Sequence, residues 1–240
     1  MMRLDVFLVN HAYCETRTKA KDLIMLGMVS VNNEIIVKPS QLVSEEDLVM
    51  VQNCDCFVSR AAYKLKQALD TFQIDLSEKI VLDIGASTGG FTECALQYGA
   101  SFVYAIDVGT SQLHPKLKQD ERVCSLEQTD ARNLVISMFE KAIDFICMDV
   151  SFISSRNILP IIADLLYDKK EAIILVKPQF ELEKKVRNKR GIVKNEKDRE
   201  MALKSVIKEA QILGLTVIDS VPCDTIGRDG NIEYLLYLKK

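Results

Sequence analysis

Two lysines and two acids occupy positions from which they could act on one substrate. Asp149 and Lys177 each follow an apolar run, Glu233 precedes another, and Lys64 lies in a helical stretch. A partly buried lysine beside a second cation has a lowered pKa and can remove a proton near neutral pH. We therefore predict proton removal from a hydroxyl by Lys177, with Asp149 orienting the amine. Lys64 and Glu233 are expected to position the hydroxyl. Each residue alone is typical of a surface ion pair, so the prediction depends on the set.

A glycine-rich turn precedes these residues in the chain. Its sequence is Asp83, Ile84, Gly85, Ala86, Ser87, Thr88, Gly89, Gly90, and a helix is expected from Phe91. The turn lacks the Gly-x-Gly-x-x-Gly pattern of dinucleotide sites and the Lys-Ser/Thr pair of phosphate loops. An acid before the turn would repel a phosphate, but it can balance a ligand that carries a cationic amino acid. The turn therefore predicts binding of S-adenosylmethionine.

Two further acids follow the next two expected strands. Asp107 comes 22 residues after Gly85, a spacing at which a carboxylate accepts hydrogen bonds from a ribose. Asp130 could accept a hydrogen bond from an adenine amino group. One such acid could simply cap a helix, but three at successive strand ends favour a nucleoside-bearing cofactor. We assign Val108 and Asp149 to the same cofactor site.

The elements that carry these residues alternate from Lys79 onward between apolar strands and helical stretches. Strands are expected at 80–84, 102–106, 123–126, 144–148, 172–176, 217–221 and 234–238. Helices are expected at 59–72, 91–98, 131–139, 158–167 and 196–213. This alternation predicts an α/β fold with a parallel βα-repeating sheet. Together with the predicted S-adenosylmethionine site, it makes a Rossmann-like methyltransferase sheet of seven mostly parallel strands the expected fold.

The first 58 residues differ in pattern, so we expect a small α+β domain at 1–58 and the larger domain at 59–240. Helices are predicted at 3–10 and 18–26, with Thr16 or Thr18 as the cap of the second. Asn32 and Asn33 are predicted to form the turn of a hairpin between 29–31 and 35–37. A last strand is expected at 47–51.

Composition fits a globular protein with a real core. The 240 residues are 48% hydrophobic and 27% charged. No apolar run approaches the roughly 20 residues of a membrane span, and no signal peptide is visible, so we expect a cytoplasmic protein. Seven scattered cysteines indicate reduced thiols. Cys54 and Cys56 lack a second pair at zinc-site spacing, so no metal is predicted.

Residues 184–199 are basic although the whole chain has a net charge of −3. Eight basic residues stand there against Glu196 and Asp198, which gives 8 − 2 = +6. Such a run is often only a solvated loop. This one follows the carboxyl end of an expected strand, where open α/β sheets bind their ligands, so it is a candidate nucleic-acid contact.

Together these motifs resemble the TlyA family, also called haemolysin A. The resemblance is carried by Arg3, Leu4, Asp5, Lys21, 59–65, 83–91, 149–151, 177–180 and 230–233. It implies an S-four type RNA-binding domain followed by an FtsJ-like 2′-O-methyltransferase domain. The family's Lys-Asp-Lys-Glu tetrad would be Lys64, Asp149, Lys177 and Glu233. The implied substrate is the cytidine 2′-hydroxyl of ribosomal RNA, with large-subunit RNA favoured and small-subunit RNA open.

One feature departs from an RNA-binding module. Residues 3–58 carry five basic and eight acidic side chains, a net charge of 5 − 8 = −3. RNA binding by this unit remains possible if its basic side chains share one helical face and contact phosphates. The side chains concerned are those of Arg3, Arg17, Lys19 and Lys21. The alternative is a unit that is structural or binds protein. The predicted RNA contacts are Arg3, Arg17, Lys19, Lys21, Arg60, Lys66, Lys184, Lys185, Arg187 and Arg190.

Three other classes of function stay open. A NAD-dependent oxidoreductase would share the fold and Asp107 but needs a different glycine turn. A membrane-lytic role is suggested only by the name haemolysin, and no long amphipathic membrane helix is visible. A ribosome-assembly factor with weak or no methylase activity would keep the RNA-binding features. Purified protein titrated with the cofactor and assayed for methyl transfer separates these classes.

Overall fold

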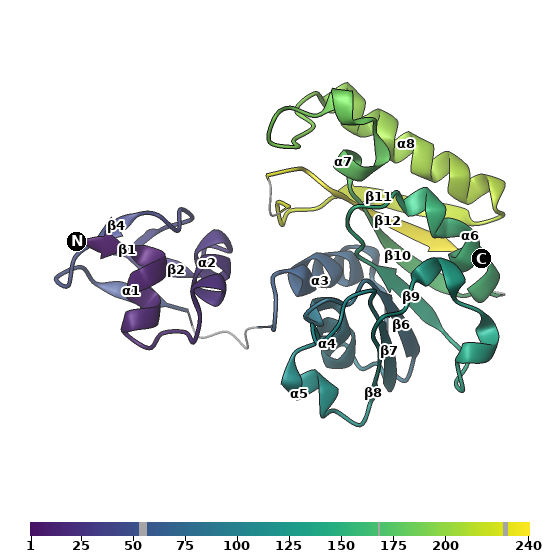
Figure 1. The fold of residues 1–240 in the computed structure, drawn as a ribbon, viewed down its shortest axis with the longest axis horizontal. Coiled ribbons are helices and arrows are strands. Elements are labelled where there is room, and N and C mark those ends of the chain that lie inside the picture. Colours follow the sequence, from purple (N-terminus) through teal and green to yellow (C-terminus); the bar gives the residue numbers. More distant parts are fainter. Residues whose placement is uncertain (53–56, 168, 228–229) are drawn as a thin grey trace. The chain divides into compact units, whose positions relative to one another are not determined.

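The computed structural model describes residues 1–52, 57–167, 169–227 and 230–240 (Figure 1). The chain divides into two compact units, Met1–Arg60 and Ala61–Lys240. Cys54 and Cys56, considered above for metal binding, lie outside the described residues. No helix within the described ranges is long and apolar enough to cross a membrane.

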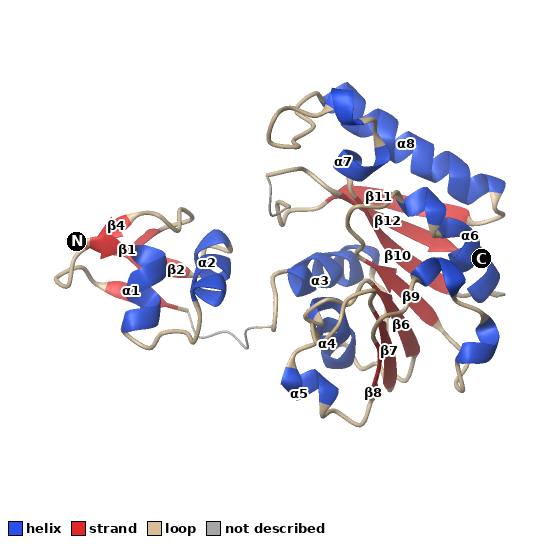
Figure 2. Ribbon diagram, in the orientation of Figure 1, coloured by secondary structure: helices blue, strands red, loops and turns tan. Residues whose placement is uncertain are grey.

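The smaller unit contains two helices and short strands, as predicted (Figure 2). Thr16 caps the second helix by accepting a hydrogen bond from the Lys19 amide. Asn32 and Asn33 both have positive φ, 52° and 69°, which fits the tight hairpin predicted there. Two strands of two residues each were not predicted because they are too short to show a period of two. The elements are β1 (Met2–Arg3), α1 (Leu4–Asn10), α2 (Arg17–Met25), β2 (Val29–Val31), β3 (Glu34–Ile35), β4 (Leu42–Val43) and β5 (Val49–Val51).

The small core forms because apolar residues of both helices face the sheet. Leu4, Phe7 and Leu8 recur at i, i+3 and i+4 on α1, so they share one helical face. They pack with Ile24 of α2 and Val29 of β2. This packing fixes the position of α1, and with it the position of Asp5, which lies between these apolar residues.

The larger unit is a seven-stranded sheet in the order β11-β12-β10-β9-β6-β7-β8, which confirms the predicted fold class. β12 pairs antiparallel with both β10 and β11, and the other pairings are parallel. Six strands therefore run one way and β12 runs the other. The strands are β6 (Ile80–Ile84), β7 (Phe102–Ile106), β8 (Val123–Leu126), β9 (Phe145–Met148), β10 (Glu171–Val176), β11 (Thr216–Pro222) and β12 (Tyr234–Lys239).

Helices cover both faces of this sheet, so its central strands are apolar at nearly every position. Residues of α6 and α8 share a core with one face, and α3 and α4 contact the strands from the other (Figure 1). The helices are α3 (Ala61–Phe72), α4 (Gly90–Gln97), α5 (Pro115–Lys118), α6 (Leu159–Leu165), α7 (Pro178–Glu181) and α8 (Glu196–Ile212).

The helix predicted at 131–139 is wrong. Two 3₁₀ turns, Ala131–Asn133 and Ile136–Met138, occupy this segment. Leu134 between them has an extended backbone, with ψ of 138°, and this breaks any continuous helix. The apolar side chains of Val135 and Ile136 are exposed, so the spacing that resembles a helix does not reflect a buried face.

Candidate active site

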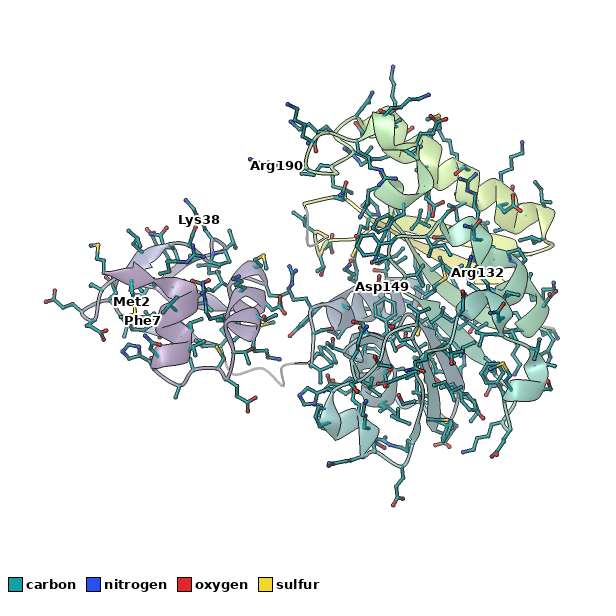
Figure 3. All side chains as sticks on the ribbon, viewed as in Figure 1. Met2, Phe7, Lys38, Arg132, Asp149 and Arg190 are labelled. Atoms are coloured by element: carbon teal, nitrogen blue, oxygen red, sulfur yellow. The ribbon has the colours of Figure 1, made fainter. Side chains whose placement is uncertain are left out.

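The predicted catalytic residues meet at one edge of the sheet. Asp149 follows β9 and Lys177 follows β10, so both lie at the carboxyl ends of parallel strands. β12 runs antiparallel, and its first residue, Tyr234, pairs with the last residue of β10. Glu233 therefore arrives at the same edge from the opposite direction. Figure 3 labels Asp149 at this edge.

The four side chains form a chain of ion pairs. Lys64 Nζ, from α3, lies 2.6 Å from Glu233 Oε2 and 4.0 Å from Asp149 Oδ2. Lys177 Nζ lies 2.5 Å from Asp149 Oδ1. That contact is an ion pair without hydrogen-bond alignment, and the directed hydrogen bond of Lys177 goes to Ser151 Oγ at 2.9 Å. Two amines and two carboxylates thus balance their charges in a buried site.

Lys64 shows that burial does not lower every lysine pKa here. Desolvation by burial lowers the pKa of Lys64, but the charges of Asp149 and Glu233 together outweigh it, so the pKa lies above its ordinary value. Lys64 stays protonated at neutral pH and acts as a fixed cation. The pKa rises although a second amine lies nearby, because two carboxylates accompany the two amines.

The glycine turn packs directly against the strand end that carries Asp149. Gly85 has φ of +85°, and a Cβ on it would lie 2.5 Å from the Asp149 carbonyl oxygen. Gly89 has φ of +93° and caps α4. Ser87 and Thr88, between them, are exposed. Only glycine allows this close approach, which places the turn, with its exposed Ser87 and Thr88, beside Asp149.

Asp83 lies buried beneath the turn. Thr92 Oγ1 donates a hydrogen bond of 2.6 Å to Asp83 Oδ2. Asp83 Oδ1 has no hydrogen bond of ordinary geometry in the described part of the chain, and the Cys147 thiol is only a weak neighbouring donor. Burial raises the pKa of Asp83 to about 7. An under-satisfied buried carboxyl next to the glycine turn suits a cationic amino-acid ligand.

The other predicted cofactor residues differ in their surroundings. Asp107 accepts from the amides of Ser87 (2.8 Å) and Gly109 (2.7 Å), so it ties the two turns together. Val108 is 71% exposed beside it. Asp130 instead caps a 3₁₀ turn and forms an ion pair with Arg132, whose hydrogen bond lowers the pKa of Asp130 to about 2.

Ala86, Gly90 and Phe91 complete the predicted cofactor set. All three are buried, and Phe91 packs its ring into the core. Their backbone rather than their side chains therefore shapes the turn. Among the described residues, no group of three His, Cys, Asp or Glu side chains could hold a metal ion.

The basic residues predicted for RNA binding in the smaller unit do not share one helical face. Asp5 is fully buried and accepts hydrogen bonds from Arg3 (2.9 Å) and Arg17 (3.0 Å). Lys21 follows Arg17 by one helical turn on α2, but Lys19 lies on another side and donates to the Phe57 carbonyl. The structure therefore places the guanidinium groups of Arg3 and Arg17 on the same carboxylate, that of Asp5.

Several other predicted RNA contacts are engaged within the protein. Arg60 pairs with Asp22 at 2.6 Å, and Lys66 pairs with Asp70 at 2.8 Å. In the basic segment, Lys185 pairs with Glu183, Arg187 donates to the Leu182 carbonyl, and Arg190 is exposed. The side chain of Lys184 lies outside the described residues.

Sequence reasoning missed Ser151, Gln179 and Phe152. Ser151 accepts the hydrogen bond of Lys177, and Gln179 donates to Glu233 Oε1 at 3.4 Å. Phe152 is 92% exposed with φ of +67°, and its ring lies 5.3 Å from that of Phe180. Their proximity to Asp149 and Lys177 in the chain was the available signal. An exposed aromatic side chain in a left-handed backbone is an unusual feature that sequence alone does not reveal.

A Rossmann-like sheet with an antiparallel last strand, a glycine turn and a lysine-carboxylate cluster defines a methyltransferase. The FtsJ-like methyltransferase family model matches residues 57–240, and the S4 domain model matches residues 2–49. The 16S/23S rRNA (cytidine-2'-O)-methyltransferase TlyA of Mycobacterium tuberculosis is 37% identical over 99% of this chain and 89% of its own. The 23S rRNA (cytidine-2'-O)-methyltransferase TlyA of Campylobacter jejuni is 34% identical over 100% of both.

A solved structure described as a hemolysin, from Streptococcus thermophilus, has 39% identity and a TM-score of 0.78 over 99% of this chain and 88% of that one. The chain belongs to the TlyA family, FtsJ-like methyltransferases with an N-terminal S4 domain. It is an enzyme whose methyl donor is S-adenosylmethionine, and the under-satisfied carboxyl of Asp83 beside the glycine turn fits the cationic amino-acid part of that donor.

Proposed function

We propose that this protein methylates the 2′-hydroxyl of cytidine in ribosomal RNA, with large-subunit RNA as the favoured substrate. The observation that carries the proposal is the cluster of Lys64, Asp149, Lys177 and Glu233 beside the glycine turn. The relatives named for this reaction support it, and the one that aligns over the full length of both chains is named for 23S RNA alone. Such an enzyme would work in the cytoplasm, with 59–240 catalysing transfer. Residues 1–58, which include the match to the S4 domain model, would bind RNA through Arg3 and Arg17 on Asp5 rather than through one basic helical face.

The residues of the cluster divide the chemistry between them. S-adenosylmethionine supplies an electrophilic methyl group on a sulfonium. Lys177, once neutral, would take the ribose hydroxyl proton onto Nζ, and Asp149 and Ser151 hold that amine in place. Lys64 remains a cation and supports the developing oxygen charge, while Glu233 keeps Lys64 in position.

The RNA must present an accessible ribose, because a stacked helical nucleotide cannot reach a buried amine. The exposed ring of Phe152 follows Ser151 directly and offers a surface on which an unstacked base can lie. Lys185 and Arg190, both exposed in the basic segment, would hold phosphates around it.

Methyl incorporation from labelled S-adenosylmethionine into isolated ribosomal RNA, subunits and whole ribosomes tests this proposal. Mapping of 2′-O-methyl positions then identifies the nucleotide. We expect label in cytidine ribose of the large-subunit RNA. RNA binding without label would instead identify an assembly factor, and lysis of red-cell ghosts by the pure protein would identify a cytolysin.

A further inference from the structure

One buried side chain, Asn231, joins the basic segment to the start of β12. It is 1% exposed. Its Oδ1 accepts a hydrogen bond of 3.0 Å from the Val193 amide, and its Nδ2 donates one of 3.2 Å to the Gly191 carbonyl. Both ends of the amide are therefore used. The bonds connect segments that are 38 and 40 residues apart in the chain.

The turn that Asn231 holds has a defined shape. Asn188 Oδ1 accepts hydrogen bonds from the Arg190 amide (2.8 Å) and the Ile192 amide (3.0 Å). Gly191 supplies the left-handed backbone, with φ of +78°. From the other side, Arg199 of α8 donates to the Val193 carbonyl at 3.2 Å. We call residues 188–192 the basic turn.

The basic turn presents cations outward. Lys189 and Arg190 are both exposed, and Figure 3 shows Arg190 at the outer tip of the segment between α7 and α8. Exposed lysine and arginine on a fixed turn suit the evenly spaced phosphates of an RNA strand. Since the turn is anchored rather than free, a phosphate bound there has a defined position relative to the sheet.

Along the chain, Asn231 lies two residues before Glu233 of the catalytic cluster. Only Ile232 separates Asn231 from Glu233, whose carboxylate pairs with Lys64 at 2.6 Å. The Glu233 carbonyl accepts from the Cys223 amide at 2.8 Å, and the Asn231 carbonyl accepts from the Gly227 amide at 3.0 Å. The backbone at both residues is thus held by hydrogen bonds.

We propose that Asn231 is a positioning residue that sets the distance between phosphates bound at the basic turn and the ribose presented to the catalytic cluster. The inference rests on the proposed function, because it takes ribosomal RNA as the ligand. Asn231 touches neither donor nor RNA in this account. Its hydrogen bonds to Val193 and Gly191 hold the Lys189–Arg190 turn at a fixed position relative to Glu233.

The test measures kcat/KM for ribosomal RNA at saturating S-adenosylmethionine, and donor affinity by calorimetry. In Asn231→Ala, kcat/KM falls about tenfold, because small misplacements of a bound substrate are costly. Donor affinity stays within about twofold. Asn195→Ala is the matched control, since Asn195 only caps α8 through the Lys197 amide; it leaves kcat/KM unchanged.

A double-mutant cycle separates positioning from general damage. In a protein that already carries Lys189→Ala and Arg190→Ala, Asn231→Ala causes a smaller loss, because the phosphate contacts that it positions are absent. Full kcat/KM in Asn231→Ala, an equal loss in both backgrounds, or a parallel loss of donor affinity each overturns the inference. Wild-type protein that binds donor but methylates no ribosomal RNA overturns the proposed function itself. In that case filter binding of RNA decides the role of Asn231. Weaker binding in Asn231→Ala than in Asn195→Ala supports the inference, and equal binding overturns it.

Discussion

Lys64 and Glu233 are separated by 169 residues, yet Lys64 Nζ lies 2.6 Å from Glu233 Oε2 in a buried ion pair. The pair links α3, which precedes the first strand of the sheet, to the residue directly before β12, the last strand in the chain. Lys64 also lies 4.0 Å from Asp149, so the pair connects the proposed catalytic cluster to two distant parts of the larger unit.

Breaking this pair on one side should destabilise the protein strongly. Lys64→Met leaves the Glu233 carboxylate buried without its cation. Glu233→Gln removes the nearer carboxylate from the Lys64 ammonium and leaves that of Asp149 at 4.0 Å. Each single change should cost roughly 3–5 kcal/mol of unfolding free energy. The double variant Lys64→Met/Glu233→Met should recover much of that loss, because no uncompensated charge remains.

Urea unfolding of the three variants checks this. The exposed i,i+4 pair Lys204–Glu200 is the matched control, and Lys204→Met should change stability by less than about 1 kcal/mol. A double variant as unstable as the sum of the single ones would show that the Lys64–Glu233 pair is not coupled.

Replacing Lys177 should remove methyl transfer and leave donor binding intact. Lys177→Ala loses the proposed base, so kcat should fall about 100-fold to 10,000-fold. Single-turnover methyl transfer gives the rate, and calorimetry with S-adenosylmethionine gives the affinity. Lys170→Ala, at the opposite end of the same strand, is the control and should keep full activity. Unchanged kcat in Lys177→Ala would remove this residue from the mechanism.

Asp83 should make the protein without bound donor less stable as pH rises. Burial raises the pKa of Asp83 to about 7, so between about pH 4 and pH 7 the folded state keeps a proton that the unfolded state has lost. Stability is therefore lost across that interval, by roughly 4 kcal/mol at most, and the contribution is constant above it. Asp83→Asn should remove this slope.

Urea unfolding at pH 5 and pH 8 measures the effect of Asp83. The control is Asp164→Asn, which changes an exposed acid on α6. The wild-type protein and this control should show the full decrease in unfolding free energy, and Asp83→Asn should not. Equal slopes in the wild-type protein and Asp83→Asn would mean that the carboxyl is charged throughout.

Asp5 should be needed for RNA binding although its own charge is negative. Its carboxylate fixes the guanidinium groups of Arg3 and Arg17, and the Arg3 hydrogen bond is the main cause that lowers the pKa of Asp5 to about 2. Asp5→Asn should weaken RNA affinity roughly tenfold, because two phosphate-binding groups lose their fixed orientation. Filter binding at several salt concentrations measures this.

The control for Asp5 removes the same charge elsewhere. Glu46 is exposed in the same unit, and Glu46→Gln should leave affinity the same or slightly increase it. If Asp5→Asn binds RNA as well as the wild-type protein does, the pairing of Arg3 and Arg17 with Asp5 has no role in recognition.

The main strands were predictable because they are buried on both faces. Runs such as those of β6 and β10 are apolar at nearly every position, and glycines or acids mark their ends. The positions of Asp149 and Lys177 at one sheet edge followed from that pattern. The placement of Glu233 depended on β12 running antiparallel, which a single apolar run does not reveal.

Contacts between side chains were not predictable from spacing. The pairing of Asp130 with Arg132, the shared use of Asp5, and the link through Asn231 all depend on geometry that the fold creates. The failed helix at 131–139 has the same origin, since apolar spacing there does not correspond to burial.

The place of β12 in the sheet also sets the order in which the enzyme is completed during its own synthesis. Elements that form the glycine turn and carry Asp149 and Lys177 leave the ribosome first. A nascent chain that has not reached Glu233 lacks the carboxylate that holds Lys64 and the strand that joins β10 to β11. We therefore expect an unfinished chain that ends before Glu233 to lack activity.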